Sequence, residues 1–462
     1  MIKKTALVLL LSSSLIYAQQ ITPGNYQARN ETELVEFEFV LPPKAYDFNT
    51  SDLLVKWHVI MFDLLEQSTG YTPNVAGRSL AYVNLAAYES MLPGHPEYQS
   101  LSGQIQEYKR PEDYDVGEEY FNDATAVNNA IFSMVDKMFA TAPYVWMEKV
   151  WAFKDSVNGV LESQLDLVTY QKSKNYGLAI ADLIYDYSKT DGGHQSYIRS
   201  YDMNYLLPAC EACFEIHRQA DVENTGPLHP QWINNRTFVA ENNTDFGIKP
   251  KVTFSKYPES PFYKMANEVY EESKTVNPGN KKYVIANFWD DAAGFTYTAP
   301  GHSFALLTMV MRNRTISLAE ATEIYARLGI AVNDAIICSW KGKYKHNLIR
   351  PVAYINRYID SAWEPKLLTP PFPEFPSGHS VQSAAMAEVL TATVGDNQEI
   401  TDYSKFWVGE PRKFNSFWEA ADEVSISRLY GGIHYRDALD QGQDMGRLVG
   451  KNVLEHLKFR AD

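Results

Sequence analysis

Residues 370–395, PPFPEFPSGHSVQSAAMAEVLTATVG, change abruptly from a proline-rich run to a helical pattern. Proline fixes φ and lacks an N–H group, so the first part is expected to be a stiff, extended segment. Apolar side chains then recur at helical spacing until Gly395, which is the expected stop signal. Ser377 or Ser380 is the expected N-cap, and Gly378 would let a ligand approach the backbone. Because a helix N-terminus presents free N–H groups, this junction is a candidate anion site.

Helical periodicity dominates the rest of the chain. It extends through residues 19–188 and again through 261–462, whereas 189–260 are rich in glycine, proline and asparagine and form an irregular, loop-rich excursion. The chain shows few alternating strand patterns and no repeat of fixed period. The sequence therefore predicts an all-α protein, with helices packed as one or two bundles, in a single continuous domain over residues 19–462.

The charge balance limits the classes of partner. The chain of 462 residues has a net charge of −15. An acidic surface argues against non-specific nucleic-acid binding, because the phosphate backbone requires a basic face. Any anion site must therefore be built by local clustering of a few cations.

The N-terminal residues MIKKTALVLLLSSSLIYAQQ are typical of a secretory signal peptide. Two lysines precede a short apolar run that ends in small residues, and cleavage is expected near Ala18, which removes residues 1–18. No other uncharged apolar run has the length of a membrane span, so no stable membrane anchor is expected. We expect an exported protein, either periplasmic or secreted.

Three cysteines are present. Cys210 and Cys213, in CEAC, are most simply a short disulfide in an exported protein, with an idle thiol pair as the alternative. A haem-attachment motif would need histidine where Phe214 stands, and a zinc site would need a second pair of ligands. Cys338 lies in an apolar run and is expected in the core.

Cations and histidines gather in three segments near the C-terminus. In the first, Lys343 and Arg350 are seven positions apart, so a single helix would present both on one face. The second is the Ser-Gly-His at the start of the helix described above. In the third, Arg428 and His434 lie on either side of two glycines, and they can converge only if those glycines break the helix. Each segment alone is a weak signal.

In combination the segments read Lys-x6-Arg-Pro (343–351), Pro-Ser-Gly-His (376–379) and Ser-Arg-x3-Gly-x-His (427–434). This resembles the three-part signature shared by vanadium-dependent haloperoxidases, type 2 phosphatidic acid phosphatases and bacterial acid phosphatases. The signature is specific because three ordered parts must coincide. Residues 75–91 and 286–303 also resemble segments of the haloperoxidases. The resemblance implies a helical-bundle haloperoxidase/acid-phosphatase-like fold, with the catalytic part in residues 261–462.

The resemblance also implies a set of site residues. Those that would surround a tetrahedral oxyanion, vanadate (vanadium V) or phosphate, are Lys343, Arg350, Ser377, Gly378, Arg428 and His434. His434 would be the one protein ligand to vanadium, or the nucleophile of a phosphatase. His379 would be the acid–base group, because imidazole exchanges a proton near neutrality. Lys343 would polarise a bound peroxide oxygen for attack by halide.

Two functions follow from this resemblance. One is a secreted vanadium-dependent haloperoxidase that uses hydrogen peroxide and a halide ion, and whose product halogenates a small organic acceptor. The alternative is an exported acid phosphatase acting through a phosphohistidine at His434. Chain length favours the peroxidase, and Trp340 and Phe372 match positions on its halide side, although core packing would explain both equally well. A non-catalytic oxyanion-binding protein would not require His379. The extent of apolar helix surface makes a homo-oligomer a reasonable expectation.

Supporting residues are harder to assign. Many family members have an acid four residues after the third-motif histidine, but this chain has Ala438 there and Asp437 one position earlier. Asp291 could be a carboxylate partner of a site arginine or could face solvent. His346, one turn from the first-motif lysine, could face the pocket or lie on a helix surface. His302 is expected to be structural.

Overall fold

The computed structural model describes residues 47–111, 119–217, 226–314, 316–404 and 410–461. Its secondary structure confirms the all-α prediction. Two short strands, β1 (Ile400–Asp402) and β2 (Arg412–Phe414), form one antiparallel pair. The expected signal peptide lies outside the described residues. Within those residues, no helix has both the length and the apolar character needed to cross a membrane.

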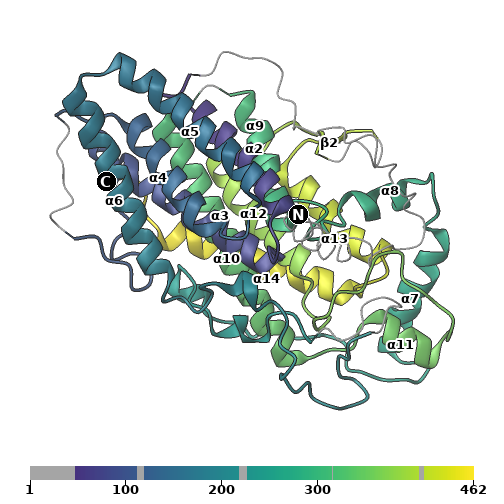
Figure 1. Ribbon diagram of the computed structural model, residues 1–462. Coiled ribbons are helices and arrows are strands. Elements are labelled where there is room, and N and C mark those ends of the chain that lie inside the picture. The colour runs from purple at the N-terminus through teal and green to yellow at the C-terminus, as the bar shows by residue number, and fades with distance from the viewer. Residues whose placement is uncertain (1–46, 112–118, 218–225, 315, 405–409, 462) are drawn as a thin grey trace, which may run out of the picture.

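The helices fall into an N-terminal and a C-terminal series (Figure 1). The first comprises α2 (Asp52–Gln67), α3 (Pro73–Met91), α4 (Asp123–Met138), α5 (Tyr144–Gln164) and α6 (Leu167–Ser188). The second comprises α7 (Pro261–Thr275), α8 (Lys281–Phe288), α9 (Thr298–Arg312), α10 (Leu318–His346), α11 (Pro351–Tyr358), α12 (Gly378–Val394), α13 (Phe417–Tyr430) and α14 (Arg436–His456). The 29-residue α10 packs against α3 and against α12, and so joins the two series.

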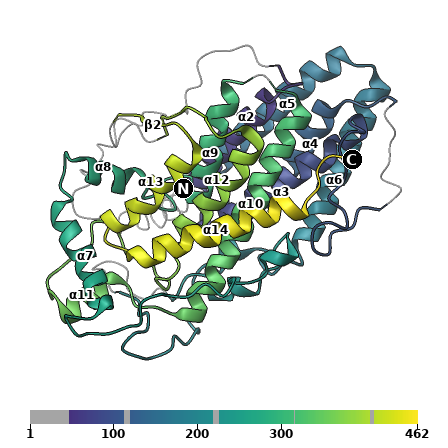
Figure 2. The ribbon, with the colours of Figure 1, turned by 180° about the vertical axis from the view of Figure 1, so that it is seen from behind.

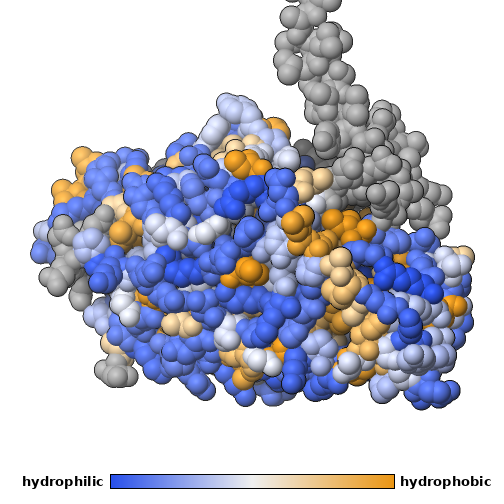
Figure 3. Space-filling model, turned by 90° about the horizontal axis from the view of Figure 1, so that it is seen from below, coloured by the Kyte–Doolittle hydropathy of each residue, from blue (hydrophilic) through white to orange (hydrophobic). Residues whose placement is uncertain are grey.

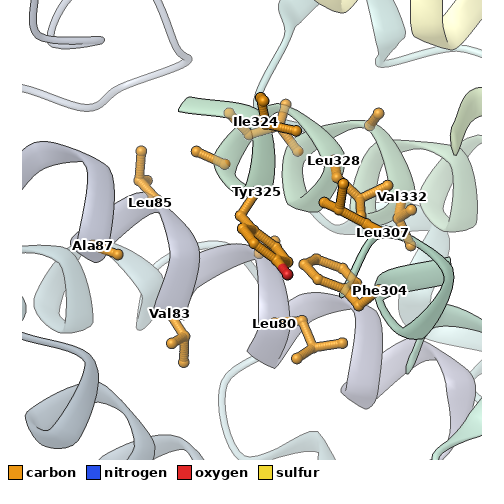
Figure 4. Close-up of a cluster of buried hydrophobic side chains, with 14 of the residues drawn as sticks. Leu80, Val83, Leu85, Ala87, Phe304, Leu307, Ile324, Tyr325, Leu328 and Val332 are labelled. Carbon is orange, nitrogen blue, oxygen red and sulfur yellow. The ribbon is translucent and has the colours of Figure 1, made fainter. Parts of the chain in front are cut away.

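The core around α10 is apolar and aromatic. Figure 4 shows Leu80 of α3, Phe304 of α9 and Tyr325 of α10 gathered between the three helices, with Leu328 farther along α10 and Val83 of α3 pointing away from them. All five side chains are buried. Burying large apolar side chains supplies most of the free energy that holds such a bundle together. The first half of α10 is therefore anchored to both series, and the first motif begins in the last turn of the same helix.

A glycine stripe brings α14 close to α12, and Figure 2 shows the two helices side by side. Gly442, Gly446 and Gly450 recur every four residues and face α12. A Cβ on Gly446 would overlap the carbonyl oxygen of Val381, and one on Gly442 would lie 2.9 Å from Ser380 Cβ. The absence of these side chains lets α14 approach the backbone of the helix that begins with the second motif.

The prediction that one helix bears both Lys343 and Arg350 is wrong. Helix α10 ends at His346, and Asn347 takes the left-handed conformation with φ of 47°. Asparagine tolerates this region better than most residues, so it can end a helix as glycine does. Arg350 is instead the N-cap of the next helix, α11.

The connector between α10 and α11 pairs with the predicted disulfide loop. Cys210 and Cys213 are bonded, as the sequence predicted, and Cys338 is buried. Asn347 O in the connector accepts a hydrogen bond from Phe214 N at 2.7 Å, and Ile349 N donates to Ala212 O at 2.9 Å. The disulfide loop thus supports the chain between two of the predicted site cations.

The described part of 189–260 contains no α-helix. It has three short 3-10 turns, at Ser196–Ile198, Pro230–Asn234 and Ala240–Asn242. The buried carboxylate of Asp334 on α10 accepts N–H bonds from Phe238 at 2.8 Å and Val239 at 3.0 Å. These bonds fasten the irregular segment to the long helix. The face in Figure 3 is mainly hydrophilic, with separate apolar patches.

Candidate active site

The proline-rich segment forms one wall of the candidate site, and Lys343 fastens it. The buried ammonium donates to the carbonyls of Pro373 at 3.1 Å, Glu374 at 3.2 Å and Pro376 at 2.5 Å. Burial and Arg350 lower the pKa of Lys343, whereas three carbonyl acceptors favour its ammonium form. With its three donors engaged in this way, Lys343 contributes positive charge to the site and holds the wall in place.

The junction between this segment and α12 matches the predicted helix start. Ser377 is the N-cap and is buried, and its side chain accepts from Ser380 N at 3.4 Å. Gly395 is the C-cap, as predicted. A Cβ on Gly378 would lie 3.7 Å from Lys343 Cε and 3.6 Å from Ser339 Oγ, so it would occupy space beside the lysine. Glycine leaves that space open next to the first N–H groups of α12.

Arg350 is buried with its guanidinium only partly satisfied. Nη1 donates to Ile433 O at 2.8 Å and lies 3.1 Å from His434 Nε2, and Nε donates to Phe372 O at 3.0 Å. Nη2 has no hydrogen-bond partner among the described residues. Burial lowers the pKa of Arg350 to about 10, opposed by Glu374. A guanidinium remains charged at neutral pH under these conditions, so an unpaired donor is left inside the protein.

Arg428 repeats this arrangement from the other side of the site. Helix α13 ends at Tyr430, and Gly432 follows with φ of 77°, so the glycines break the helix as predicted. Arg428 Nη1 donates to Trp289 O at 2.6 Å and lies 3.0 Å from His379 Nε2. Its Nε and Nη2 are buried without a partner among the described residues. Burial lowers the pKa of this arginine, against the opposing effect of nearby aspartates.

His434 is buried between a carboxylate and the cations. Its Nδ1 lies 2.9 Å from Glu374 Oε1, which also accepts Tyr435 N at 2.9 Å. Burial lowers the pKa of His434 well below its usual value, and Arg350 lowers it further. The imidazole is therefore neutral, with its proton on Nδ1 and a lone pair on Nε2. That lone pair faces Arg350 Nη1, 3.1 Å away.

Glu374 is a functional candidate that sequence reasoning missed. Burial raises its pKa to about 7, although Arg350 and Lys343 oppose the shift. It provides the support for His434 that Ala438 cannot provide. The signal was present in the sequence, because Glu374 is the one acid inside the proline-rich run PPFPEFPS. Burying a carboxylate requires a partner, but only the fold shows that this partner is His434.

His379 is the candidate site histidine that reaches solvent. Its side chain is 21% exposed, against 3% for His434. Nε2 lies 3.0 Å from Arg428 Nη1 and 3.9 Å from Asp291 Oδ2. A partly exposed imidazole that touches a site arginine can exchange protons with water, which suits acid–base chemistry.

Trp340 and Phe372 form an aromatic wall beside the cations. Their ring centroids are 5.1 Å apart. The Phe372 ring lies 5.0 Å from Lys343 Nζ and 4.9 Å from Arg350 Cζ, within cation–π range. Trp340 Nε1 donates to Leu228 O at 3.3 Å. The structure thus brings both aromatic side chains to the site predicted for them.

The two supporting candidates differ. His346 lies 3.0 Å from Ile248 O through Nε2 and packs against the Phe375 ring, so its contacts are with the irregular segment and the outer side of the wall. Asp291 is buried and faces His379, as noted above, and it acts electrostatically on Arg428. His302, expected to be structural, contacts Asp291 Oδ1 at 2.9 Å.

The donors fit a tetrahedral oxyanion. Three buried cations act electrostatically on His434, and two of them have buried N–H groups without a partner among the described residues. Such groups cost free energy unless an acceptor binds them. Bidentate guanidinium donors match the spacing of vanadate or phosphate oxygens.

Comparison with proteins of known structure identifies the family. A crystal structure described as the first bacterial vanadium-dependent iodoperoxidase is 31% identical to this chain, with a TM-score of 0.78, over 91% of this chain and 99% of that one. The chain belongs to the vanadium-dependent haloperoxidases. A holo-type bacterial vanadium-dependent chloroperoxidase is 15% identical, with a TM-score of 0.58, over 85% and 93% of the two chains, and so shares the fold.

Two sequence comparisons agree with this assignment. The family model for the second helical-bundle domain of VCPO matches residues 323–462, which include all three motifs. Vanadium chloroperoxidase from Curvularia inaequalis is 24% identical over 178 residues, a match that covers 27% of this chain and 29% of that haloperoxidase.

Proposed function

We propose that this haloperoxidase binds vanadate at His434 and oxidises halide with hydrogen peroxide. The observation that supports the proposal is the surplus of buried positive charge around His434 Nε2. Arg350 Nη2 and both Nε and Nη2 of Arg428 lack partners among the described residues. An oxyanion on His434 would satisfy these donors and neutralise the cations.

The vanadate site would use six residues of the chain. They are Lys343, Arg350, Ser377, Gly378, Arg428 and His434. When bound, vanadate supplies an electrophilic centre that activates hydrogen peroxide toward halide. Glu374 would hold the Nδ1 proton of His434 and so keep a lone pair on Nε2, the proposed ligand atom. The arginines and Lys343 hold the oxyanion by charge.

His379 would act as the acid–base group. Because Arg428 Nη1 donates toward its Nε2, that nitrogen holds a lone pair in the resting state. Nε2 can accept the proton that hydrogen peroxide loses on binding and can return it to a departing oxygen. Asp291, whose Oδ2 lies 3.9 Å away, stabilises the imidazolium formed in between.

The aromatic wall would line the halide side. Trp340 and Phe372 exclude water from one side of the cations without adding a competing anion. A large, weakly hydrated halide such as iodide fits this environment at least desolvation cost. The 31% identical relative is described as an iodoperoxidase, which supports iodide as the first substrate to test. The proposal also includes export of the protein, halogenation of a small organic acceptor and assembly into a homo-oligomer.

The test begins with purified protein stripped of bound oxyanion. One portion receives orthovanadate and is assayed for peroxide-dependent oxidation of iodide and bromide. The other stays free of vanadate and receives a phosphate monoester. We expect halide oxidation that requires vanadate and that inorganic phosphate suppresses. Ester hydrolysis without halide oxidation would instead establish the acid phosphatase, with His434 as nucleophile.

A matched pair of variants sharpens the result. His434→Ala removes the proposed ligand, and we expect it to abolish halide oxidation. His456→Ala changes a histidine on α14 whose side chain is 42% exposed, and it should leave the activity unchanged. Equal activity in both variants would contradict the assignment of His434.

A further inference from the structure

A row of buried ionisable groups leads away from His379 into the protein. Asp291 Oδ2 faces His379, and its other oxygen, Oδ1, lies 2.9 Å from His302 Nδ1. His302 Nε2 then lies 2.7 Å from Asp402 Oδ2. Residues 291, 302 and 402 come from the loop after α8, from α9 and from β1, so three separate elements converge here.

The surroundings of His302 fix its ring. The side chain is 2% exposed, and the Trp289 ring lies 4.4 Å from it, with Phe288 and Tyr297 each at 5.7 Å. Ser404 Oγ lies 3.2 Å from Nε2. Both ring nitrogens therefore face oxygen atoms. With two carboxylates as partners, the imidazole is doubly protonated, because each nitrogen must donate.

Packing alone does not explain this arrangement. Burying two carboxylates and an imidazolium costs more free energy than burying apolar groups of the same volume. Asp291 also has a φ of 51°, in the left-handed region that is strained for a residue with a side chain. Strain and buried charge at a residue that faces an acid–base histidine indicate a functional constraint.

We propose that His302, held by Asp402, is a positioning residue that aims the Asp291 carboxylate at His379. The proposal rests on the proposed function of His379 as the acid–base group. No proton or other atom passes through His302. Its imidazolium fixes one oxygen of Asp291, so the second oxygen keeps its direction toward His379.

Charge supports the same role. Without Asp402, His302 and Asp291 would form a neutral pair, and the carboxylate would have little electrostatic effect on His379. Asp402 neutralises His302, and the three residues together keep one net negative charge. That charge favours the protonated form of His379 and also acts on Arg428.

Other charged groups act on the same two histidines. Among the described residues, Asp291 and Arg428 face His379, and Asp291 and Asp402 face His302. His434 interacts electrostatically with His379, and the phenol of Tyr297 lies near both aspartates. Each of these groups remains in the variants below unless it is the one replaced. A shift in the titration of His379 can therefore be assigned to the replaced residue.

The test compares His302→Gln and Asp402→Asn with a buried control. His58→Gln serves as the control, because His58 is also buried and stacked on aromatic rings, but it contacts Leu54 O and Asn84 instead of carboxylates. Asp402→Asn keeps the size and an acceptor oxygen, so it should fold even if His302→Gln does not.

Two readouts are needed. The first is the imidazole titration of His379, followed by NMR of histidine-labelled protein without vanadate. The second is the pH profile of iodide oxidation with saturating vanadate. We expect Asp402→Asn, which removes the net negative charge of the three residues, to move the midpoint of His379 to lower pH by about one unit. His302→Gln removes a positive charge instead, so it should move the midpoint to higher pH. The corresponding limb of the pH profile should move with it, whereas His58→Gln should move neither.

The outcomes separate the two proposals. Unchanged midpoints in the folded variants, with only a loss of stability like that of the control, would overturn the positioning role. If the wild-type protein oxidised no halide, the proposed function would fail, but the NMR titration would still decide whether His302 and Asp402 act on His379.

Discussion

His434 Nδ1 lies 2.9 Å from Glu374 Oε1. The histidine of the third motif is therefore oriented by a carboxylate from the proline-rich segment that leads into the second motif. The same oxygen accepts the backbone N–H of Tyr435. Two bonds to one oxygen fix the rotation of the imidazole and leave Nε2 directed at the cations. The wall therefore supports the proposed ligand as well as the helix start.

Replacing Glu374 should weaken oxyanion binding. We expect Glu374→Ala to raise the Kd for orthovanadate by about 10- to 100-fold, because loss of such an outer partner frees the ligand. Glu374→Gln keeps an acceptor oxygen, so its Kd should lie between those of the wild type and Glu374→Ala. Equilibrium dialysis measures both. The control is Glu364→Ala, an exposed residue of the preceding loop, whose Kd should match the wild type. An unchanged Kd in Glu374→Ala would remove Glu374 from the site.

Lys343 should matter for folding before any ligand binds. Its ammonium holds three carbonyls of the wall, so Lys343→Met should lower the free energy of unfolding by about 2–4 kcal/mol in the absence of vanadate. Urea denaturation measures the change. Lys345→Met removes a 56% exposed lysine paired with Asp245 and should cost less than about 1 kcal/mol. Equal losses would show that the three bonds contribute nothing.

The pH dependence of stability should reveal the charge on His302. Burial alone would lower the pKa of His302, but Asp291 and Asp402 raise it to about 9. A raised pKa means that the stabilisation is complete below the usual value of 6.5 and is lost as pH rises through about 9. The stability gap between wild type and His302→Gln should thus shrink by about 3 kcal/mol across that interval. Thermal denaturation in a pH series measures it, and a constant gap would mean that His302 is neutral.

The glycine stripe should resist even a methyl group. Gly446→Ala places a Cβ against the backbone of α12, and we expect it to cost about 1–3 kcal/mol. Gly159→Ala lies inside helix α5 with nothing within 4 Å of its Cβ, so it should stabilise by about 0.5–1 kcal/mol. Chemical denaturation compares the two. Stabilisation by both would mean that α12 and α14 are not in close contact.

Much of the candidate site could be predicted because local chemistry determines it. Ser377 starts a helix through its own side chain, and the glycines after Tyr430 end one through their backbone freedom. Such signals act over a few residues and are visible in a single sequence. The order of the motifs then indicated the family, and the comparison with known proteins agrees with that assignment.

The missed features depend on packing between distant segments. The sequence did not indicate that α10 ends at His346, because the seven-residue spacing of Lys343 and Arg350 also suits an uninterrupted helix. Glu374 and His434 are sixty positions apart, and Asp402 is one hundred from His302. The role of a buried charged residue depends on its partner, and the identity of that partner follows only from the fold.

The stripe of Gly442, Gly446 and Gly450 suggests a way to sort distant sequences. The stripe lies on α14, which carries none of the proposed site residues. It nevertheless determines how closely α14 approaches the backbone of α12. A homologue with the three motifs and this Gly-x3-Gly-x3-Gly pattern eight residues after the third-motif histidine should keep the same arrangement of motif residues. One with bulky residues there must hold its two helices farther apart, and its motif residues cannot be assumed to meet.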